Sequence, residues 1–299
     1  MAYLDNALEA HISWHITQFG KSNFEGCDVI AYYGGIQFWS KDVYQPKIEN
    51  LASKNKAEEG HPKCLVIILY TTGGSVEAVE KMVEITRHFY QEVSFIVPDI
   101  AMSAGTIWCM SGDRIFMDYS SSLGPIDPQL LLPDGRWVPA LGYLDKSEEL
   151  IKKSAEGKLT DAELAMLTNL DLAQLRRFEQ ARDLSIDLLK KWLVEYKFRN
   201  WNTHQTNPLK VGKIVTKRQK TNRAQEIAKA LSDNRKWHSH SRMIGINTLI
   251  NELHLKIEDY TNNPQMSDSI RNLHRVIMEY MERAKLQVLV LTSFSPDAI

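Results

Sequence analysis

The sequence is poor in cysteine, with only Cys27, Cys64 and Cys109 among 299 residues. These three show no metal-ligand spacing and are odd in number, so the pattern favours neither a zinc site nor a disulfide framework. Reduced cysteines are usual in the cytoplasm. We therefore expect reduced cysteines, no bound metal and a cytoplasmic location.

Long hydrophobic runs are also missing. The longest, such as CLVIILY and LQVLVL, have the length of a strand, whereas a membrane-spanning helix needs about 18 or more apolar residues. The opening MAYLDNALEAHISWHITQFG lacks the basic start and apolar run of a signal peptide. The sequence therefore predicts no transmembrane segment and no secretory leader.

An excess of charge of one sign is absent as well. Lysine and arginine number 36 against 37 aspartates and glutamates, for a formal net charge of -1. This balance excludes a global electrostatic argument for nucleic acid or an anionic membrane. Residues 197–223 are locally basic. A solvated loop over a helical lid is the interpretation we prefer there to a nucleic-acid or acidic-partner patch, so no nucleic-acid partner is expected.

Strand and helix patterns alternate over the first part of the chain. Strands are predicted at 27–35, 64–72, 92–99 and 113–118, and helices at 1–23, 44–60, 75–91 and 102–112. Short connections between such elements favour an α/β fold whose parallel strands are joined by right-handed crossovers.

Helical patterns dominate later in the chain. They extend from about 145 to 197 and recur at 224–233, 242–253 and 266–284. The last segment, LQVLVLTSF, predicts either a terminal strand or an assembly segment. We therefore divide the chain into a core, 1–143, and a largely helical extension or lid, 144–299, that also serves oligomerisation.

Two glycine-containing turns carry the chemistry. In LYTTGGSVEAVE a buried strand ends at Gly73-Gly74 and a helix begins. Backbone N–H groups at such a turn can point at an anion. The turn has neither the lysine of a Walker loop nor the GxGxxG spacing, so a phosphate cradle competes with a plain strand-to-helix turn.

The second turn, PDIAMSAGT, places Ser103 at the start of a helix. The positive end of the helix dipole favours a developing alkoxide there. The backbone N–H of Ala104 and that of Gly74 could then stabilise a tetrahedral intermediate. Taken alone, a serine before Ala-Gly is more often a helix cap or a packing contact; the two turns together point to acyl transfer.

Three segments, TTGGSVEAVEKMVE, DIAMSAGTIWCMSGDRIFMD and SSLGPIDPQ, resemble the core motifs of the ClpP/crotonase-fold serine peptidases. The chain is most similar to the signal peptide peptidase A-like branch and, within it, to the serine dehydrogenase proteinase family. The resemblance covers about residues 64–129. It implies a spiral of ββα units, with Ser103 as nucleophile and Gly74 and Ala104 at the oxyanion hole.

The general base is harder to assign, because no histidine lies between Ser103 and His204. Asp127 stands near the place where ClpP carries its histidine. The signal peptide peptidase A branch uses a Ser-Lys dyad, and a lysine becomes a base when burial lowers its pKa. We expect Lys146 in this role, since it follows DGRWVPALGYLD and starts a helix. Lys153, one of two further lysines nearby, is an alternative.

A rival base comes from NRKWHSHSRMIG. His240 would need the helical tail to fold back over Ser103 or to reach a neighbouring subunit. On an extended segment His238 and His240 would share a face, but as a zinc pair they lack a third ligand. Arg242 could hold a peptide carboxylate.

The resemblance implies a serine endopeptidase that acts on peptides or proteins through an acyl-enzyme, without a cofactor, as a homo-oligomer. A crotonase-type acyl-CoA enzyme and a non-catalytic scaffold or peptide-binding protein are the alternatives. The chain carries no ATPase motif, so an unfolding motor would be a separate partner.

Overall fold

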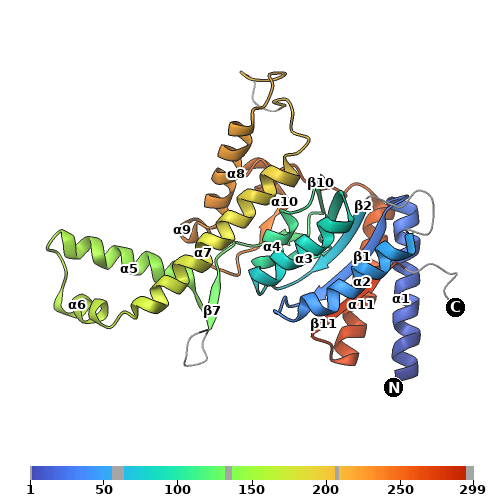
Figure 1. Cartoon of the computed structure of the whole chain (residues 1–299), viewed down its shortest axis with the longest axis horizontal. Coiled ribbons are helices and arrows are strands. Elements are labelled where there is room, and N and C mark those ends of the chain that lie inside the picture. The colour runs from blue at the N-terminus through green and yellow to red at the C-terminus, as the bar shows by residue number, and fades with distance from the viewer. Residues whose placement is uncertain (1, 56–63, 132–136, 206–208, 294–299) are drawn as a thin grey trace.

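The computed structural model describes residues 2–55, 64–131, 137–205 and 209–293. At its centre is a six-stranded sheet with helices on both faces (Figure 1). In spatial order the strands are β10 (Glu258–Asp259), β5 (Arg114–Met117), β3 (Glu92–Ile96), β2 (Cys64–Tyr70), β1 (Asp28–Gly34) and β11 (Val288–Thr292). All neighbours are parallel except β11, which runs antiparallel to β1. The mostly parallel α/β sheet predicted from the alternation is confirmed.

Successive residues of the central strands alternate between two hydrophobic cores. In β2, Ile67 packs into one core and Val66 and Ile68 into the other, as the two-residue period of a strand requires. The helices that contribute to the first core include α2 (Ser40–Asn55), α3 (Val76–Phe89), α4 (Ala104–Cys109), α7 (Leu172–Trp192) and α8 (Lys217–Leu231). Two helices, α1 (Ala2–Asn23) and α11 (Pro264–Ala284), cover the other face.

Helix α3 shows how the local sequence positions the turn before it. Ser75 is its N-cap, and the Ser75 hydroxyl accepts a hydrogen bond from the Ala78 N–H at 3.1 Å. Ala78, Val79, Met82, Val83 and Thr86 form its buried face, at the three- and four-residue spacing of an amphipathic helix. The cap makes the helix begin directly after Gly73-Gly74, which keeps that turn short.

A second sheet of three short strands lies beside the first. Its order is β4 (Ile100–Ala101), β6 (Ser122–Leu123) and β9 (Ile244–Gly245); β4 and β6 are parallel and β9 is antiparallel to β6. The expected single helix over 242–253 is therefore wrong at its start, because β9 precedes α10 (Ile246–Asn251). A strand from the second half of the chain thus lies in the same small sheet as the strand that leads into Ser103.

Two helical projections extend from this body (Figure 1). The first follows the hairpin of β7 (Gln129–Leu131) and β8 (Trp137–Pro139) and contains α5 (Ala140–Ala155) and α6 (Asp161–Thr168). The second is formed where α7 passes through the π-helical turn η1 (Leu193–Lys197) to α8, before the short α9 (Asn234–Trp237). The division at residue 143 stays a prediction; β9, β10 and β11, from beyond it, complete the two sheets.

The expectation of reduced cysteines is wrong for two of the three. Cys27 and Cys64 form a disulfide, with their Cα atoms 4.9 Å apart, whereas Cys109 is free and buried. The pairing follows from the sheet, since Asp28 of β1 faces Leu65 of β2 and the residues just before them are therefore neighbours. Because the two cysteines are 37 positions apart, their spacing in the sequence does not predict this disulfide. The cytoplasmic location stays a prediction.

No helix in the described part of the chain combines the length and the apolar character that crossing a bilayer demands.

Burial of Lys197 predicts a pH-dependent gain in stability on its replacement. The Lys197 ammonium donates to the Asp113 backbone oxygen at 3.5 Å, and burial lowers its pKa to about 8. We expect Lys197→Met to raise the free energy of unfolding by about 1 to 2 kcal/mol at pH 7, after allowance for solvent screening. The gain should shrink as pH rises from about 8 towards 10.5, where the unfolded chain still holds a proton that the folded one has lost.

Urea unfolding at several pH values measures this effect. Lys191→Met, at an exposed position near the end of α7, directly before η1, is the matched control and should leave the unfolding free energy nearly unchanged. A loss of stability in Lys197→Met at pH 7 would show that the buried ammonium is net stabilising.

Candidate active site

Ser103 stands at the N-cap position of α4 but does not act as a cap. Its side chain makes no capping hydrogen bond, whereas Ser75 caps α3 in the ordinary way. The Ser103 backbone has φ 51° and ψ -113°, a combination that costs a non-glycine residue on the order of 1 to 3 kcal/mol. The helix-cap interpretation therefore does not hold, and the strained backbone needs another explanation.

The strained turn is held by the burial and bonding of α4. All six residues of the helix are buried. The Thr106 hydroxyl oxygen lies 2.9 Å from the carbonyl oxygens of both Ala101 and Gly124, and it accepts the Gly124 N–H at 2.9 Å. Thr106 thus ties the serine helix both to β4 and to the segment that follows β6.

The two glycine-containing turns meet at Ser103. Beyond β2 the chain pairs with β4: the Thr71 N–H donates to the Ile100 oxygen and the Met102 N–H to the Thr71 oxygen, each at 3.0 Å. Gly73 has φ 102°, and a Cβ there would come within 2.9 Å of the Ser103 Cβ. The structure therefore places in contact two turns that the sequence separates by a strand and a helix.

Two backbone N–H groups at this junction are available as donors. Ile36 donates to the Gly73 oxygen at 2.8 Å and accepts from the Ser75 N–H at 2.7 Å, so the Gly74 N–H between them points away from Ile36. Among the described residues, neither the Gly74 N–H nor the Ala104 N–H donates to another group of the chain. These are the two oxyanion-hole positions expected from the sequence.

Asp127 lies after β6 and is buried, with 2% of its surface exposed. Its Oδ1 accepts the Leu141 N–H at 3.0 Å, while its Oδ2 has no hydrogen-bond partner in the described part of the chain. Burial, with a smaller contribution from the negative charge of Asp145, raises the pKa of Asp127 to about 6. The group can therefore exchange a proton near neutral pH.

The segment that carries His240 leaves the small sheet at this same end. Leu123 pairs with Ala101 on one side and with Ile244 on the other. The residues after β4, those after β6 and those before β9 therefore leave the sheet at one end, with neighbouring strands about 5 Å apart. Burial lowers the pKa of His240, and its Nδ1 is a buried atom that lacks a partner among the described residues.

The expected pairing of His238 with His240 on one strand face is wrong. His238 ends α9 with φ 60°, so the segment is turned rather than extended. No group of three or more His, Cys, Asp or Glu side chains placed to hold a metal ion occurs in the described ranges.

Lys146 and Lys153 lie along α5, which leads away from the sheets (Figure 1). The sequence predicts that Lys146 starts a helix. This prediction is wrong, because α5 already begins at Ala140. The Lys146 side chain is 55% exposed, and its ammonium is 3.1 Å from the Glu149 carboxylate. Hydrogen bonds to Glu163 and Glu149 raise the pKa of Lys153, which opposes a role as base.

No hydrogen bond in the described structure joins the Ser103 hydroxyl to Lys146, Lys153, Asp127 or His240. Catalytic hydrogen bonds are often completed only when substrate is bound. The four candidate bases are therefore distinguished by the burial of each side chain, by its hydrogen-bond and ion-pair partners, and by its position in the fold.

Sequence reasoning missed Thr106 and Gly124, and it did not predict the contact between Gly73 and Ser103. Gly73, Thr106 and Gly124 lie in the segments TTGG, SAGT and SSLG, where small residues in a turn indicate close backbone packing. Their contacts join separate turns, however, and only the folded chain shows them.

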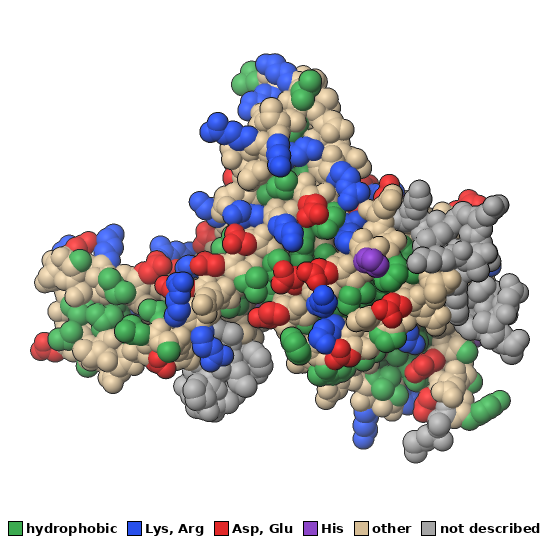
Figure 2. Space-filling model, in the orientation of Figure 1, with side chains coloured by type: hydrophobic (Ala, Val, Ile, Leu, Met, Phe, Trp, Pro, Cys, Tyr) green, Lys and Arg blue, Asp and Glu red, His purple; other side chains and the backbone are tan. Residues whose placement is uncertain are grey.

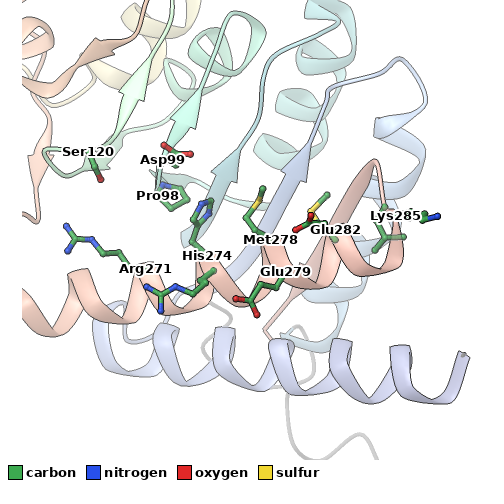
Figure 3. A pocket seen from close by; sticks show the side chains of 12 residues that line it. Pro98, Asp99, Ser120, Arg271, His274, Met278, Glu279, Glu282 and Lys285 are labelled. Atoms are coloured by element: carbon green, nitrogen blue, oxygen red, sulfur yellow. The ribbon is translucent and has the colours of Figure 1, made fainter.

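A separate cavity lies elsewhere in the described structure. It has a volume of about 810 Å³ and lies between α11 and the turn at Pro98-Asp99, towards which His274 points (Figure 3). His274 Nδ1 is 3.2 Å from the Tyr33 hydroxyl. None of the predicted site residues lines the cavity, and α11 and α4 pack into different cores. We therefore do not assign the serine chemistry to it.

Comparison with known proteins places these features in a family context. Two curated archaeal proteins of Methanocaldococcus jannaschii, the uncharacterized proteins MJ0137 and MJ1495, are 40% identical over 68 residues and 33% identical over 64 residues. The matches cover 23% and 21% of this chain, and only 24% and 22% of the length of those relatives.

Two solved structures of the membrane-bound stomatin-specific protease 1510-N are also similar. One is a serine-to-alanine mutant, with a TM-score of 0.32, 43% of this chain covered and 64% of that one. The other is a lysine-to-alanine mutant in complex with a substrate peptide, with a TM-score of 0.33, 43% of this chain covered and 60% of that one. Both are 20% identical in sequence.

The sequence model of one family matches residues 51–209, just over half of the chain. The matched region contains the glycine turn, the strained serine and the α5–α7 projection. It extends well beyond residues 64–129, which hold the three motif segments. The chain therefore belongs to the ClpP-like SDH-type serine proteinases.

Proposed function

We propose that the protein is a serine endopeptidase that forms an acyl-enzyme on Ser103. The observation that carries this proposal is the Ser103 turn itself: a serine held at φ 51° at the start of a buried helix, uncapped and in contact with Gly73. Membership in a serine proteinase family supports the same chemistry.

In the proposed reaction the Ser103 oxygen attacks the carbonyl carbon of the scissile peptide bond and gives its proton to a base. The N–H groups of Gly74 and Ala104 stabilise the negative oxygen of the tetrahedral intermediate. Each such donor contributes about 3 to 4 kcal/mol to transition-state stabilisation in enzymes of this kind. The C–N bond then breaks, the base returns the proton to the leaving amine, and water hydrolyses the ester on Ser103.

We propose His240 as the base, with Asp127 as the carboxylate that orients it. Three observations support this choice over Lys146: the shared end of the β4-β6-β9 sheet, the unpartnered His240 Nδ1 and the unpartnered Asp127 Oδ2. Burial keeps a histidine neutral at pH 7, the state in which it can accept a proton. A Ser103–Lys146 dyad is the competing assignment, and it would require a lysine from another copy of the chain or a movement of α5.

The substrate we propose is an extended peptide that adds as a strand beside the glycine turn. Homo-oligomerisation, which would confine such a site, is also a proposal; the α5–α7 projection offers a surface for it. A crotonase-type acyl-CoA enzyme and a non-catalytic scaffold are the alternatives that the first experiment separates.

Covalent labelling tests the nucleophile. A fluorophosphonate probe should label the wild-type protein on Ser103, and Ser103→Ala should abolish labelling because the reacting oxygen is gone. Ser75→Ala, which removes the cap of α3 instead, is the matched control and should still be labelled. A folded wild-type protein that stays unlabelled would contradict the proposal, and calorimetric binding of coenzyme A would then favour the acyl-CoA enzyme.

The contact between Gly73 and Ser103 predicts a second effect on labelling. Gly73→Ala should slow the modification of Ser103 at least tenfold and lower the free energy of unfolding by about 2 kcal/mol or more. The new Cβ would collide with Ser103, and alanine would be held at a φ that is unfavourable for any residue with a side chain. Gly157→Ala is the control: Gly157 also has a positive φ, 67°, but open space around it. Equal labelling rates in the two variants would show that the contact does not matter to the site.

The pH dependence of hydrolysis separates the two bases. With His240 as base, kcat/KM should fall as pH decreases through about 6, because protonation disables both His240 and Asp127. His240→Gln should lower kcat by roughly 100-fold or more, and Lys146→Met should leave it unchanged. Loss of activity in Lys146→Met, together with a rate that rises only at alkaline pH, would instead assign the Ser-Lys dyad.

A further inference from the structure

The second projection, where α7 gives way to α8, has an unusual charge. Between Glu195 and Glu226 there is no acidic residue, whereas eight lysines and arginines fall in this stretch of a chain whose net charge is -1. The serine chemistry does not use these residues. The positive charge of this stretch therefore needs a separate explanation.

The end of this projection, residues 209–218, which we call the tip, exposes apolar side chains among the cations. Leu209, Val211 and Ile214 are 84%, 58% and 80% exposed. Lys210, Lys213, Lys217 and Arg218 are exposed beside them. In Figure 2 the hydrophobic and basic side chains gather at the outermost end of the upper projection, and no acidic side chain is visible there.

The tip presents these side chains because its backbone is bonded. Thr203 pairs with Ile214 across the loop, the His204 N–H donates to the Lys213 oxygen at 3.0 Å, and the Val215 N–H donates to the Asn202 oxygen at 2.9 Å. Val215 is buried while Ile214 points outward, as the alternation of an extended segment requires. The exposed aliphatic groups are thus a fixed feature of the fold.

The form and chemistry of the tip favour one class of partner. Aliphatic side chains ringed by lysines match the boundary between anionic headgroups and acyl chains. A single-stranded nucleic acid would call for aromatic stacking surfaces, but the Trp201 ring is packed against Phe198, with centroids 5.5 Å apart. A narrow end that projects outward also offers a protein partner little area to bury.

The other projection provides an internal comparison. It too exposes apolar side chains, among them Met166 at 59% and Leu172 at 75%, but Asp161, Glu163 and Asp171 lie beside them. Exposed apolar groups therefore occur on both arms, and only the tip combines them with uncompensated positive charge.

We propose that the tip is a peripheral membrane-binding element for anionic lipid bilayers. Val211, Ile214 and Leu209 would enter the headgroup–acyl boundary, while Lys210, Lys213 and Lys217 contact lipid phosphates. This attachment is separate from the serine chemistry and holds whether or not the proposed peptidase activity is correct.

Co-sedimentation with lipid vesicles tests the proposal. The full chain should bind vesicles of phosphatidylcholine with about a third phosphatidylglycerol, bind pure phosphatidylcholine far more weakly, and lose binding as salt rises. Each of Lys210→Gln and Lys213→Gln should lower the partition coefficient roughly fivefold. The double variant Val211→Ser/Ile214→Ser should lower it roughly tenfold or more.

The matched control is Met166→Ser/Leu172→Ser, which removes equally exposed apolar groups from the other arm and should bind vesicles like the wild type. Ser103→Ala should also bind normally, since the nucleophile takes no part. Absent binding, equal binding to neutral vesicles, or equal loss in the control variant would overturn the proposal. So would tight binding of a single-stranded oligonucleotide that the lysine variants weaken and the Val211→Ser/Ile214→Ser variant does not.

Discussion

The short backbone pairing between Thr71 and Ala101 is the constraint on which the site depends. It joins the end of β2 to β4 through two hydrogen bonds of 3.0 Å, and it brings Gly73 against Ser103. A side chain at Gly73 would occupy the space of the Ser103 Cβ, so the glycine and the strained serine must be considered together. Burial of the whole of α4 then prevents the serine turn from relaxing.

The second sheet extends this constraint to the rest of the chain. Because β6 lies between β4 and β9, the segments that carry Asp127 and His240 are attached to the strand that leads into Ser103. Two buried polar atoms there, the Asp127 Oδ2 and the His240 Nδ1, lack partners within the described residues. Unsatisfied buried groups cost about 1 to 3 kcal/mol each, so these two atoms call for a functional explanation. The exposed ends of the two projections, by contrast, differ mainly in charge.

Much of the fold could be predicted from local patterns. Continuous apolar runs indicated the buried strands β1 and β2, and the cap and spacing after Ser75 indicated α3. The strand option for residues 286–294 agrees with β11 as far as the described residues extend. The prediction was wrong where pairing across the chain decided the outcome: the Cys27–Cys64 disulfide depends on neighbouring strands, and β9 is a strand only because β6 lies beside it. Two-residue strands carry no periodic signal.

The sequence by itself determined the local features: glycines after a strand and a serine before small residues at the candidate site, and elsewhere a basic stretch without acids. These are local facts, set by residue type and order. Only the tertiary structure decided which of them meet. It placed Gly73 against Ser103, carried Lys146 out along α5 beside Glu149, and brought the segment that carries His240 to the end of the small sheet from which β4 leads to Ser103. The physical reason is that burial and contact depend on strand order and packing, which the spacing of residues along the sequence does not reveal.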